Sequence, residues 1–301
     1  MSAPVQRRID ALAIGVVVLL CVLWGLQQVA IKQAIAGGLP PVLQAALRSA
    51  FAGLLVAGWI WTRQGPGKLL EMVRSGGPRW PGLALALIFA VEFLVFYPGL
   101  RLTTAARGVL FFYTAPFFTA IFAHWFIPGE RLRARQVLGL VVAFAGVALA
   151  FATGLFAPGG SLLGDAMCCF AGVLWGLSTA MVKAHPKLRA ASSAQAQLYL
   201  LGGSAPFMLL AAWFAGELGH MPVATTLAWA ALAYQVVVVA FASYLAWYWL
   251  LARYPVTQIA GYTFLTPLFG ILAGTVLLGE PASAALFAGL GAIALGMRLL
   301  R

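Results

Sequence analysis

Apolar stretches of about 20 residues follow one another along most of the chain, and they restrict what it can fold into. Part of the first stretch is "AIGVVVLLCVLWG", from Ala13 to Gly25. A stretch of this kind crosses a bilayer as a helix, because hydrocarbon offers the backbone no water and a helix bonds its own N–H and C=O groups. We therefore expect an all-α integral membrane protein.

The hydropathy pattern predicts ten transmembrane helices. They cover residues 11–33, 40–62, 81–100, 104–127, 134–154, 163–185, 192–214, 226–250, 256–278 and 281–300. The longest connection, around residues 63–80, contains Gly, Pro and basic residues and is predicted to be a surface loop. No cleavable signal peptide is expected, since the first apolar run continues as one of many spans.

The composition excludes a soluble domain and its charge indicates an orientation. Of the residues 63% are hydrophobic and 9% charged, too few for a soluble surface. With the N-terminus inside, 15 of the 19 basic residues fall in cytoplasmic segments: Arg7, Arg8, Arg63, Lys68, Arg74, Arg79, Arg131, Arg133, Arg135, Lys183, Lys187, Arg189, Arg253, Arg298 and Arg301. The positive-inside rule then predicts both termini in the cytoplasm. The membrane that we expect is the inner membrane of a bacterium. The net charge of +12 sets orientation and attracts membrane lipid, and we expect no nucleic-acid partner.

The chain repeats itself after 151 residues. The stretch "CVLWGLQQVAIK" at 21–32 is matched by "GVLWGLSTAMVK" at 172–183. Further matches extend the repeat over the whole chain: Gln44 on Gln195, Tyr97 on Tyr248, Pro116 on Pro267 and, one residue out of step, "GE" at 129–130 on "GE" at 279–280. We predict a single membrane domain made of two five-helix repeats, residues 1–152 and 153–301.

The number of helices in each repeat decides the geometry. Because five is odd, the second repeat enters the membrane from the side opposite to the first. The repeats are then inverted copies around a central cavity, an arrangement typical of secondary transporters with a site near the midplane. An enzyme or a structural protein gains nothing obvious from this symmetry, so the pattern predicts a transporter that works by alternating access.

These motifs, in this order and in both halves, resemble a known family. The "WG" of the first span, the lysine eight residues after its tryptophan, Arg48 in the second span, the proline of the fourth and the "GE" that follows are similar to the EamA-type drug/metabolite transporters. Within that superfamily the chain most resembles the YddG-type aromatic amino acid exporters. The resemblance implies a ten-helix fold, a central substrate cavity, and export of aromatic and other apolar amino acids.

Polar residues spaced by four mark the predicted walls of the cavity. The first and sixth spans carry Trp24, Gln28 and Lys32, and Trp175, Thr179 and Lys183; the second and seventh carry Gln44 and Arg48, and Gln195 and Tyr199. Spacing of four keeps side chains on one helical face. That face should look into the protein, because lipid offers polar groups no partner. The two lysines lie near span ends, where snorkelling to the interface is the alternative reading.

The halves differ at two charged positions. Arg48 is replaced by Tyr199 in the second half, and Glu92 by Ser243. An amino acid needs a cation for its carboxylate and an acceptor for its ammonium. We therefore predict that Arg48 attracts the carboxylate, while Glu92 neutralises the ammonium or carries a proton. The alternative is that Arg48 and Glu92 are structural charges paired with each other or with nearby helices.

Aromatic residues and two prolines complete the predicted site. Aromatic side chains that lie well inside the predicted spans or near the two prolines suit a bulky apolar ligand. The substrate-binding candidates are Trp24, Gln28, Gln44, Arg48, Glu92, Tyr97, Tyr113, Trp175, Thr179, Tyr199, Ser243, Tyr244, Trp247, Tyr262 and Phe264. Pro116 and Pro267 each remove a backbone hydrogen bond within a span, and are predicted as gating elements or static kinks.

Other functional classes leave little trace in the chain. We expect no cofactor, metal or catalytic residues: the three cysteines have no metal spacing, and no phosphate-binding loop occurs. The partners expected are a small-molecule substrate, an amino acid, and membrane lipid, with the protein as a monomer. The alternatives are a carrier for cationic drugs, sugars or another metabolite, and an integral membrane enzyme acting on lipid-linked substrates.

Overall fold

The computed structural model describes residues 9–74, 77–103, 105–152, 160–218, 223–270, 272 and 284–300. Throughout the described residues the regular elements are helices. The chain divides into two compact units: unit 1 contains Met1–Leu26, Val95–Ala180 and Arg253–Arg301, and unit 2 contains Gln27–Leu94 and Met181–Ala252. Each unit draws on both halves of the sequence. Adding 151 to 27 and 94 gives 178 and 245, close to the bounds 181 and 252 of the second stretch of unit 2.

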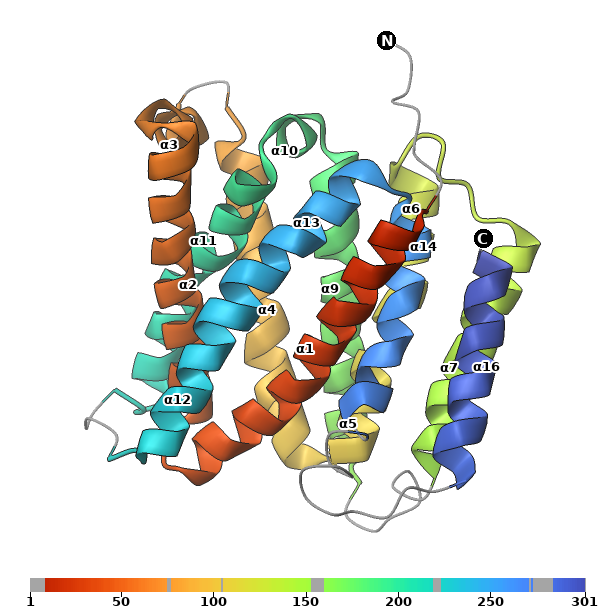
Figure 1. The fold of residues 1–301 in the computed structure, drawn as a ribbon. Coiled ribbons are helices and arrows are strands. Elements are labelled where there is room, and N and C mark those ends of the chain that lie inside the picture. The colour runs from red at the N-terminus through yellow and green to blue at the C-terminus, as the bar shows by residue number, and fades with distance from the viewer. Residues whose placement is uncertain are drawn as a thin grey trace. The chain divides into compact units, whose positions relative to one another are not determined.

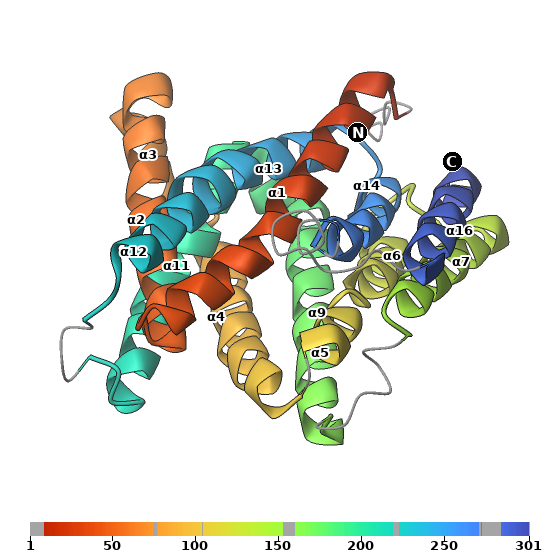
Figure 2. The ribbon, with the colours of Figure 1, turned by 60° about the horizontal axis from the view of Figure 1, so that its bottom comes forward.

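Unit 2 is built on a pair of antiparallel helices. α2 (Pro41–Gln64) and α11 (Ser193–Phe214) lie side by side (Figures 1 and 2). The Ser192 hydroxyl donates to Gln64 Oε1 at 2.9 Å, joining the start of α11 to the end of α2. Gly53 faces Gly202 midway, where a Cβ on Gly53 would come within 2.8 Å of the Gly202 Cα. Small residues therefore allow the two backbones to approach closely.

The remaining helices of unit 2 surround this pair. They are the last part of α1 (Ala11–Ala36), α3 (Pro66–Val73), the first part of α4 (Arg79–Leu102), the end of α9 (Leu162–Ala184), α10 (Pro186–Ala190), and a continuous helical stretch formed by α12 (Thr226–Tyr234), the π-helix η1 (Gln235–Ser243) and α13 (Tyr244–Arg253). α3 corrects our prediction of a loop around residues 63–80. Pro66 stands at the first turn, where proline favours a helix, and Met72 gives it a buried contact.

Unit 1 contains a second antiparallel pair. α7 (Ala134–Ala150) and α16 (Ala284–Leu300) lie side by side (Figures 1 and 2). Gly139 near the start of α7 lies against Gly296 near the end of α16, and Gly146 lies against Gly289. A Cβ on Gly139 would come within 2.7 Å of the Gly296 carbonyl oxygen. These two helices are the fifth predicted helix of each half, just as α2 and α11 are the second.

Among the other helices of unit 1, one kind of close contact occurs twice. These helices are the first part of α1 (Ala11–Ala36), the last part of α4, α5 (Ala105–Phe112), α6 (Ala115–Phe126), most of α9 (Leu162–Ala184), α14 (Val256–Tyr262) and the 3₁₀ turn η2 (Thr263–Leu265). A Cβ on Gly25 of α1 would lie 3.0 Å from the Phe269 backbone, and one on Gly176 of α9 would lie 2.7 Å from the Thr119 backbone nitrogen. The two glycines are 151 residues apart, and the segments that they contact are separated by nearly the same offset.

The described helices match the predicted spans in part. Seven stretches of the described chain are long and apolar enough to cross a membrane: Ala11–Ala36, Pro41–Gln64, Arg79–Leu100, Arg107–Phe126, Leu162–Ala184, Ser193–Phe214 and Thr226–Arg253. Shorter apolar helices, Ala134–Ala150 and Phe287–Leu300, occupy two further predicted spans. The predicted span 256–278 is described as far as residue 270 and at residue 272. The protein is thus an all-helical, multi-pass membrane protein.

Both prolines lie just after a break in their predicted span. α5 ends at Phe112, and α6 begins at Ala115 with Pro116 in its first turn. In the second half, α14 passes into the 3₁₀ turn Thr263–Leu265 before Pro267. Proline is tolerated in the first turn of a helix, where its missing N–H would have no intrahelical partner. Each proline therefore starts a helix and does not kink a continuous one.

Candidate functional site

Buried polar side chains gather in unit 2. Gln44 and Arg48 lie on α2, Glu92 on α4, Gln197 on α11 and Gln235 at the start of η1, and each is at most 2% exposed. Amides and charges inside an apolar bundle cost free energy unless they find partners. The chemistry of this cluster therefore depends on which of its polar atoms have a hydrogen-bond partner among the described residues and which do not.

Arg48 is held over aromatic rings, and its N–H groups make no hydrogen bond within the described part of the chain. Its Cζ atom lies 4.2 Å from the centroid of the Phe93 ring and 5.8 Å from that of Phe89. Both distances fall within the range of a cation–π interaction, which orients the guanidinium. Nε, Nη1 and Nη2 of Arg48 make no hydrogen bond to any residue that the structure describes. Since a guanidinium has five N–H donors, Arg48 presents a full set of donors to an anionic oxygen ligand.

Acceptors without partners accompany these donors. Oε2 of Glu92 and Oε1 of Gln44 are buried, and neither accepts a hydrogen bond within the described part of the chain. Glu92 directly precedes Phe93, the ring beneath Arg48, and Gln44 lies one helical turn before Arg48. The two charged side chains, on α2 and α4, interact electrostatically, but among the described residues they form no ion pair within 4 Å. The cluster thus offers donors for an anion and acceptors for a cation.

Two glutamines fix the π-helix of unit 2. Nε2 of Gln197 donates to the carbonyl oxygens of Ala240 and Phe241 at 2.6 and 2.9 Å. Nε2 of Gln44 donates to Oε1 of Gln235 at 3.0 Å. A π-helix is a rare element that is frequent at functional sites. Here side-chain amides bond to its carbonyl groups and to its first residue.

Aromatic rings form a separate cluster in unit 1. The Trp175 ring lies 6.2 Å from Trp24, 5.7 Å from Tyr113 and 5.3 Å from Phe112, measured between ring centroids. The planes of Phe112 and Trp175 are stacked at 7°, while Trp24 and Tyr113 meet Trp175 edge-on. Edge-on and stacked rings attract each other beyond their buried area. The tryptophans that mark the sequence repeat are therefore in direct contact.

A second group of rings lies next to the proline breaks. Phe264, in the 3₁₀ turn before Pro267, packs 5.8 Å from Phe117 and 6.2 Å from Phe144. Tyr262 ends α14, and its carbonyl oxygen accepts a hydrogen bond from the Cys21 thiol. The broken spans are thus surrounded by apolar rings within unit 1.

The other predicted site residues have varied surroundings. The Tyr199 hydroxyl donates to the carbonyl oxygen of Met72 at the end of α3, and the Ser243 hydroxyl donates to Val239 of its own helix at 2.6 Å. Tyr97, Thr179 and Trp247 are buried, and Tyr244 is half-buried. Gln28 lies on α1, and its side chain is outside the described residues, as is the second "GE" motif.

The structure adds residues that sequence reasoning missed. Gln197 and Gln235 have no polar counterpart at the equivalent positions, Ala46 and Ala84, and an asymmetry of this kind is the signal that singled out Arg48. Phe112 precedes Tyr113 and could have been found as part of "FFYTAP". Asp165 of α9 was not singled out: it binds Arg107 in an ion pair and accepts from the Thr103 hydroxyl at 2.7 Å. Within the described chain no group of three His, Cys, Asp or Glu residues is placed to hold a metal ion.

The chain matches a family model over residues 11–152 and 162–301, described as the EamA-like transporter family. It is 29% identical over 278 residues to "Uncharacterized transporter YvbV" of Bacillus subtilis, covering 90% of this chain and 85% of that protein. An "Uncharacterized transporter" of Archaeoglobus fulgidus is 26% identical over 80% of this chain and 81% of its own.

Two further similarities agree with this match. The uncharacterized protein PA1977 of Pseudomonas aeruginosa is 32% identical over 72% of both chains. A protein of known crystal structure shares the fold with a TM-score of 0.77, at 22% identity over 97% of this chain and 98% of that one. With its apolar helices and a family match over nearly its whole length, the chain belongs to the EamA-like transporter family and is a multi-pass membrane transporter.

Proposed function

We propose that this transporter exports aromatic and other apolar amino acids across the bacterial inner membrane by alternating access. One observation carries the proposal: among the residues that the structure describes, a buried cluster in unit 2 contains N–H donors of Arg48 without acceptors, and the acceptors Glu92 Oε2 and Gln44 Oε1 without donors. An α-amino acid has a carboxylate and an ammonium group on one carbon atom. It supplies both missing partners at once, which a purely cationic drug or a neutral sugar does not.

The aromatic content of unit 1 supports an apolar side chain on the substrate. Trp24, Phe112, Tyr113 and Trp175 form a connected group of rings, and Tyr97, Tyr262 and Phe264 are buried in the same unit. Ring faces and edges bind apolar and aromatic groups without requiring polar partners. In the proposal Arg48 and Glu92 of unit 2 determine the preference for a zwitterion.

Alternating access is supported by the pairing of equivalent helices. The second helices of the two halves, α2 and α11, run antiparallel in unit 2, and the fifth, α7 and α16, run antiparallel in unit 1. Antiparallel equivalents are what two inverted five-helix repeats produce, and inverted repeats provide two similar gates. The proposal therefore includes ten helices, one membrane domain and one substrate site that opens to either side.

Counterflow in proteoliposomes tests the substrate. The purified protein is reconstituted with unlabelled phenylalanine inside, and uptake of labelled phenylalanine is followed. We expect accumulation that unlabelled phenylalanine inhibits more strongly than phenethylamine, which lacks the carboxylate, or 3-phenylpropionate, which lacks the amine. If phenethylamine competes better than phenylalanine, the protein is a carrier of cations, and if no labelled solute moves, the amino acid proposal is wrong.

Two variants separate the charged groups. Arg48→Gln should lower the preference for phenylalanine over phenethylamine, and Glu92→Gln should lower the preference for phenylalanine over 3-phenylpropionate. Each preference should fall at least about tenfold, because a hydrogen bond to a charged group contributes about 1.5–3 kcal/mol. Arg63→Gln, at an exposed arginine that stacks on Trp59, is the matched control. A variant that loses all competitors equally has lost structure and not recognition. Unchanged transport and unchanged pH dependence in Glu92→Gln would remove Glu92 from the mechanism.

A further inference from the structure

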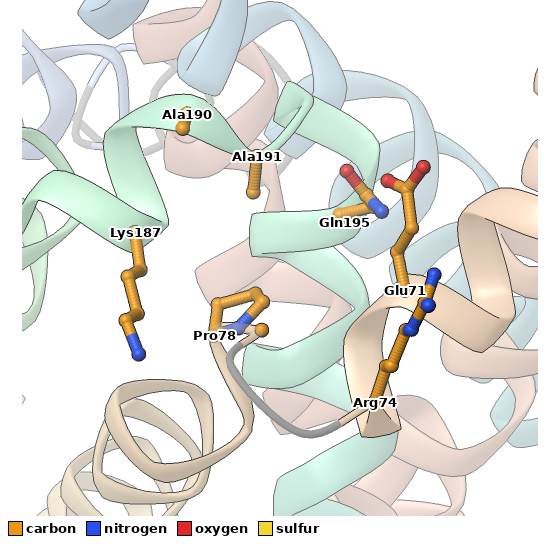
Figure 3. A pocket seen from close by; sticks show the side chains of 8 residues that line it. Glu71, Arg74, Pro78, Lys187, Ala190, Ala191 and Gln195 are labelled. Atoms are coloured by element: carbon orange, nitrogen blue, oxygen red, sulfur yellow. The ribbon is translucent and has the colours of Figure 1, made fainter.

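A pocket of about 280 Å³ opens at the end of unit 2 that carries α3 and α10. Glu71 and Arg74 at the end of α3, Gly77 and Pro78 before α4, and Lys187, Ala190, Ala191 and Gln195 around α10 and the start of α11 line it (Figure 3). A water molecule takes about 30 Å³ of liquid, so the pocket can hold a group much larger than water. One part of the lining comes from the segment between α2 and α4, and the other comes from the segment between α9 and the start of α11. These two segments do not correspond to each other in sequence or in length.

Hydrogen bonds hold one wall of this pocket in place. Nε2 of Gln195 donates to the carbonyl oxygen of Lys68 at 2.7 Å, and Oε1 of Gln195 accepts from the Ser192 backbone at 2.9 Å. The Tyr199 hydroxyl binds the carbonyl oxygen of Met72. These bonds tie α3 to α11 at two successive turns. The hydrogen bonds between α3 and α11 therefore fix the backbone beside the pocket, and the pocket does not depend on surface side chains alone.

The charge of the lining is positive. Arg74 and Lys187 lie on different sides of Pro78 (Figure 3), and neither has an acidic side chain within 4 Å among the residues that the structure describes. Glu71 is the acidic residue of the lining, and its carboxylate is already bound by Lys68 Nζ at 2.9 and 3.0 Å. Two cations thus remain for a ligand from outside the chain.

Exposed apolar side chains lie close in the chain to the residues that line the pocket. Leu70 and Val73 of α3 are 66% and 68% exposed, and Trp80 at the start of α4 is 69% exposed. Exposed apolar residues beside arginine and lysine are typical of a helix that lies at the boundary between acyl chains and head groups. Tryptophan is enriched at the same depth.

We propose that this pocket binds the phosphate group of an anionic phospholipid. Arg74 and Lys187 bind the phosphate oxygens, the Arg74 guanidinium through paired N–H donors and the Lys187 ammonium as a point charge. Leu70, Val73 and Trp80 contact the acyl chains of the same lipid. This inference does not depend on the identity of the transported solute, and it is not affected if the amino acid proposal fails.

Native mass spectrometry of the detergent-solubilised full-length protein tests the site. Phosphatidylglycerol, phosphatidylcholine and inorganic phosphate are titrated separately, and phosphate is also used as a competitor of the lipid. We expect saturable binding of phosphatidylglycerol that is stronger than binding of phosphatidylcholine and that phosphate does not displace at equal concentration. Equal binding of the two lipids overturns the proposal. Binding of phosphate as tight as that of the anionic lipid also overturns it, and shows a site for a free anion.

A matched pair of double variants makes the test specific to the pocket. Arg74→Gln with Lys187→Gln removes the two pocket cations, and binding of phosphatidylglycerol should weaken about 30-fold, because each basic residue near anionic lipid contributes about fivefold. Arg63→Gln with Arg189→Gln removes the same charge at exposed positions of the same unit, outside the pocket lining, and should weaken binding no more than about threefold at physiological salt. An equal loss in both double variants overturns the proposal, since attraction would then follow net charge. A melting temperature like that of wild type shows that each variant is folded.

Discussion

Glu130 acts on a helix far from it in the sequence. Its Oε1 and Oε2 atoms accept hydrogen bonds from the backbone N–H groups of Val256 and Thr257 at 3.0 and 3.2 Å. These N–H groups belong to the first turn of α14, and the N–H groups of a first turn have no acceptor within their own helix. A carboxylate is also favoured there by the positive end of the helix dipole. The repeated "GE" motif thus has a structural role in its first copy.

We predict that Glu130→Gln lowers the stability of the protein. The amide oxygen can replace one of the two carboxylate bonds, so the expected loss is about 1–2 kcal/mol, seen as a lower melting temperature in detergent. Glu71→Gln is the control, because its ion pair with Lys68 is exposed and should contribute less than about 0.5 kcal/mol. Equal melting temperatures for Glu130→Gln and wild type would show that the cap is not needed.

Gly25 is a position where only a hydrogen atom fits. A Cβ there would approach the backbone nitrogen of Gly270 to 2.8 Å, whereas a Cβ on Gly15 of the same helix meets nothing within 4 Å. We predict that Gly25→Leu destabilises the protein by about 3 kcal/mol or abolishes its folding, while Gly15→Leu is tolerated. The yield of folded protein on size-exclusion chromatography measures both. Similar yields for the two variants would contradict the close approach.

At the scale of elements, the π-helix η1 depends on Gln197. A wider helix changes the register of its carbonyl groups, and Gln197 Nε2 provides a donor to two of them, on Ala240 and Phe241. The same stretch begins with Gln235, which Gln44 binds. The π-helix is therefore connected by side chains to α2 and α11, the pair on which unit 2 is built.

We predict that Gln197→Met weakens this connection. Methionine has a similar volume but no N–H group, so two carbonyl oxygens lose a donor in an apolar interior, at a cost of about 1–3 kcal/mol. Transport should fall together with the melting temperature, because the variant changes the helix that follows Gln235. Gln33→Met, at an exposed glutamine of α1, serves as the control. A Gln197→Met variant with wild-type stability and counterflow would show that the amide is dispensable.

The breaks before Pro116 and Pro267 show what an element adds to a sequence pattern. Proline predicts a disturbed helix, and that much can be read from each half alone. Whether the disturbance is a kink or a break depends on the residues before it. In the first half α5 ends in the turn around Tyr113, and in the second a 3₁₀ turn packs Phe264 against Phe117 and Phe144. Tertiary packing selects these local structures.

At the scale of the whole molecule, the distribution of basic residues predicts the topology. With 15 of 19 basic residues in the segments predicted to be cytoplasmic, both termini should lie in the cytoplasm. A fluorescent protein that folds only in the cytoplasm should fluoresce when it is fused to either end. Alkaline phosphatase, which is active only outside, should be inactive at both ends. Activity of opposite reporters at the two ends would exclude an even number of spans and with it two five-helix repeats.

The two compact units do not coincide with the two halves of the sequence. The halves follow from the repeat after 151 residues, whereas each unit combines equivalent segments of both. Equivalent helices pack against each other, α2 with α11 and α7 with α16, because their small residues meet at matching heights when the two run antiparallel. Contact within a unit therefore joins residues that are more than a hundred positions apart.

The amino-acid sequence by itself determined the class of the protein and much of its division into helices. Hydrocarbon leaves the backbone no partner but itself, so long apolar runs specify helices whatever their neighbours are. It also singled out Arg48, Glu92, Trp24 and Trp175, through their depth in a span and their place in the repeat. Only the tertiary structure decided that Arg48 lies over Phe93, that Gln197 reaches the π-helix, and that Arg107 pairs with Asp165. Side-chain partners depend on distances between helices far apart in the chain, and no local pattern of residues contains those distances.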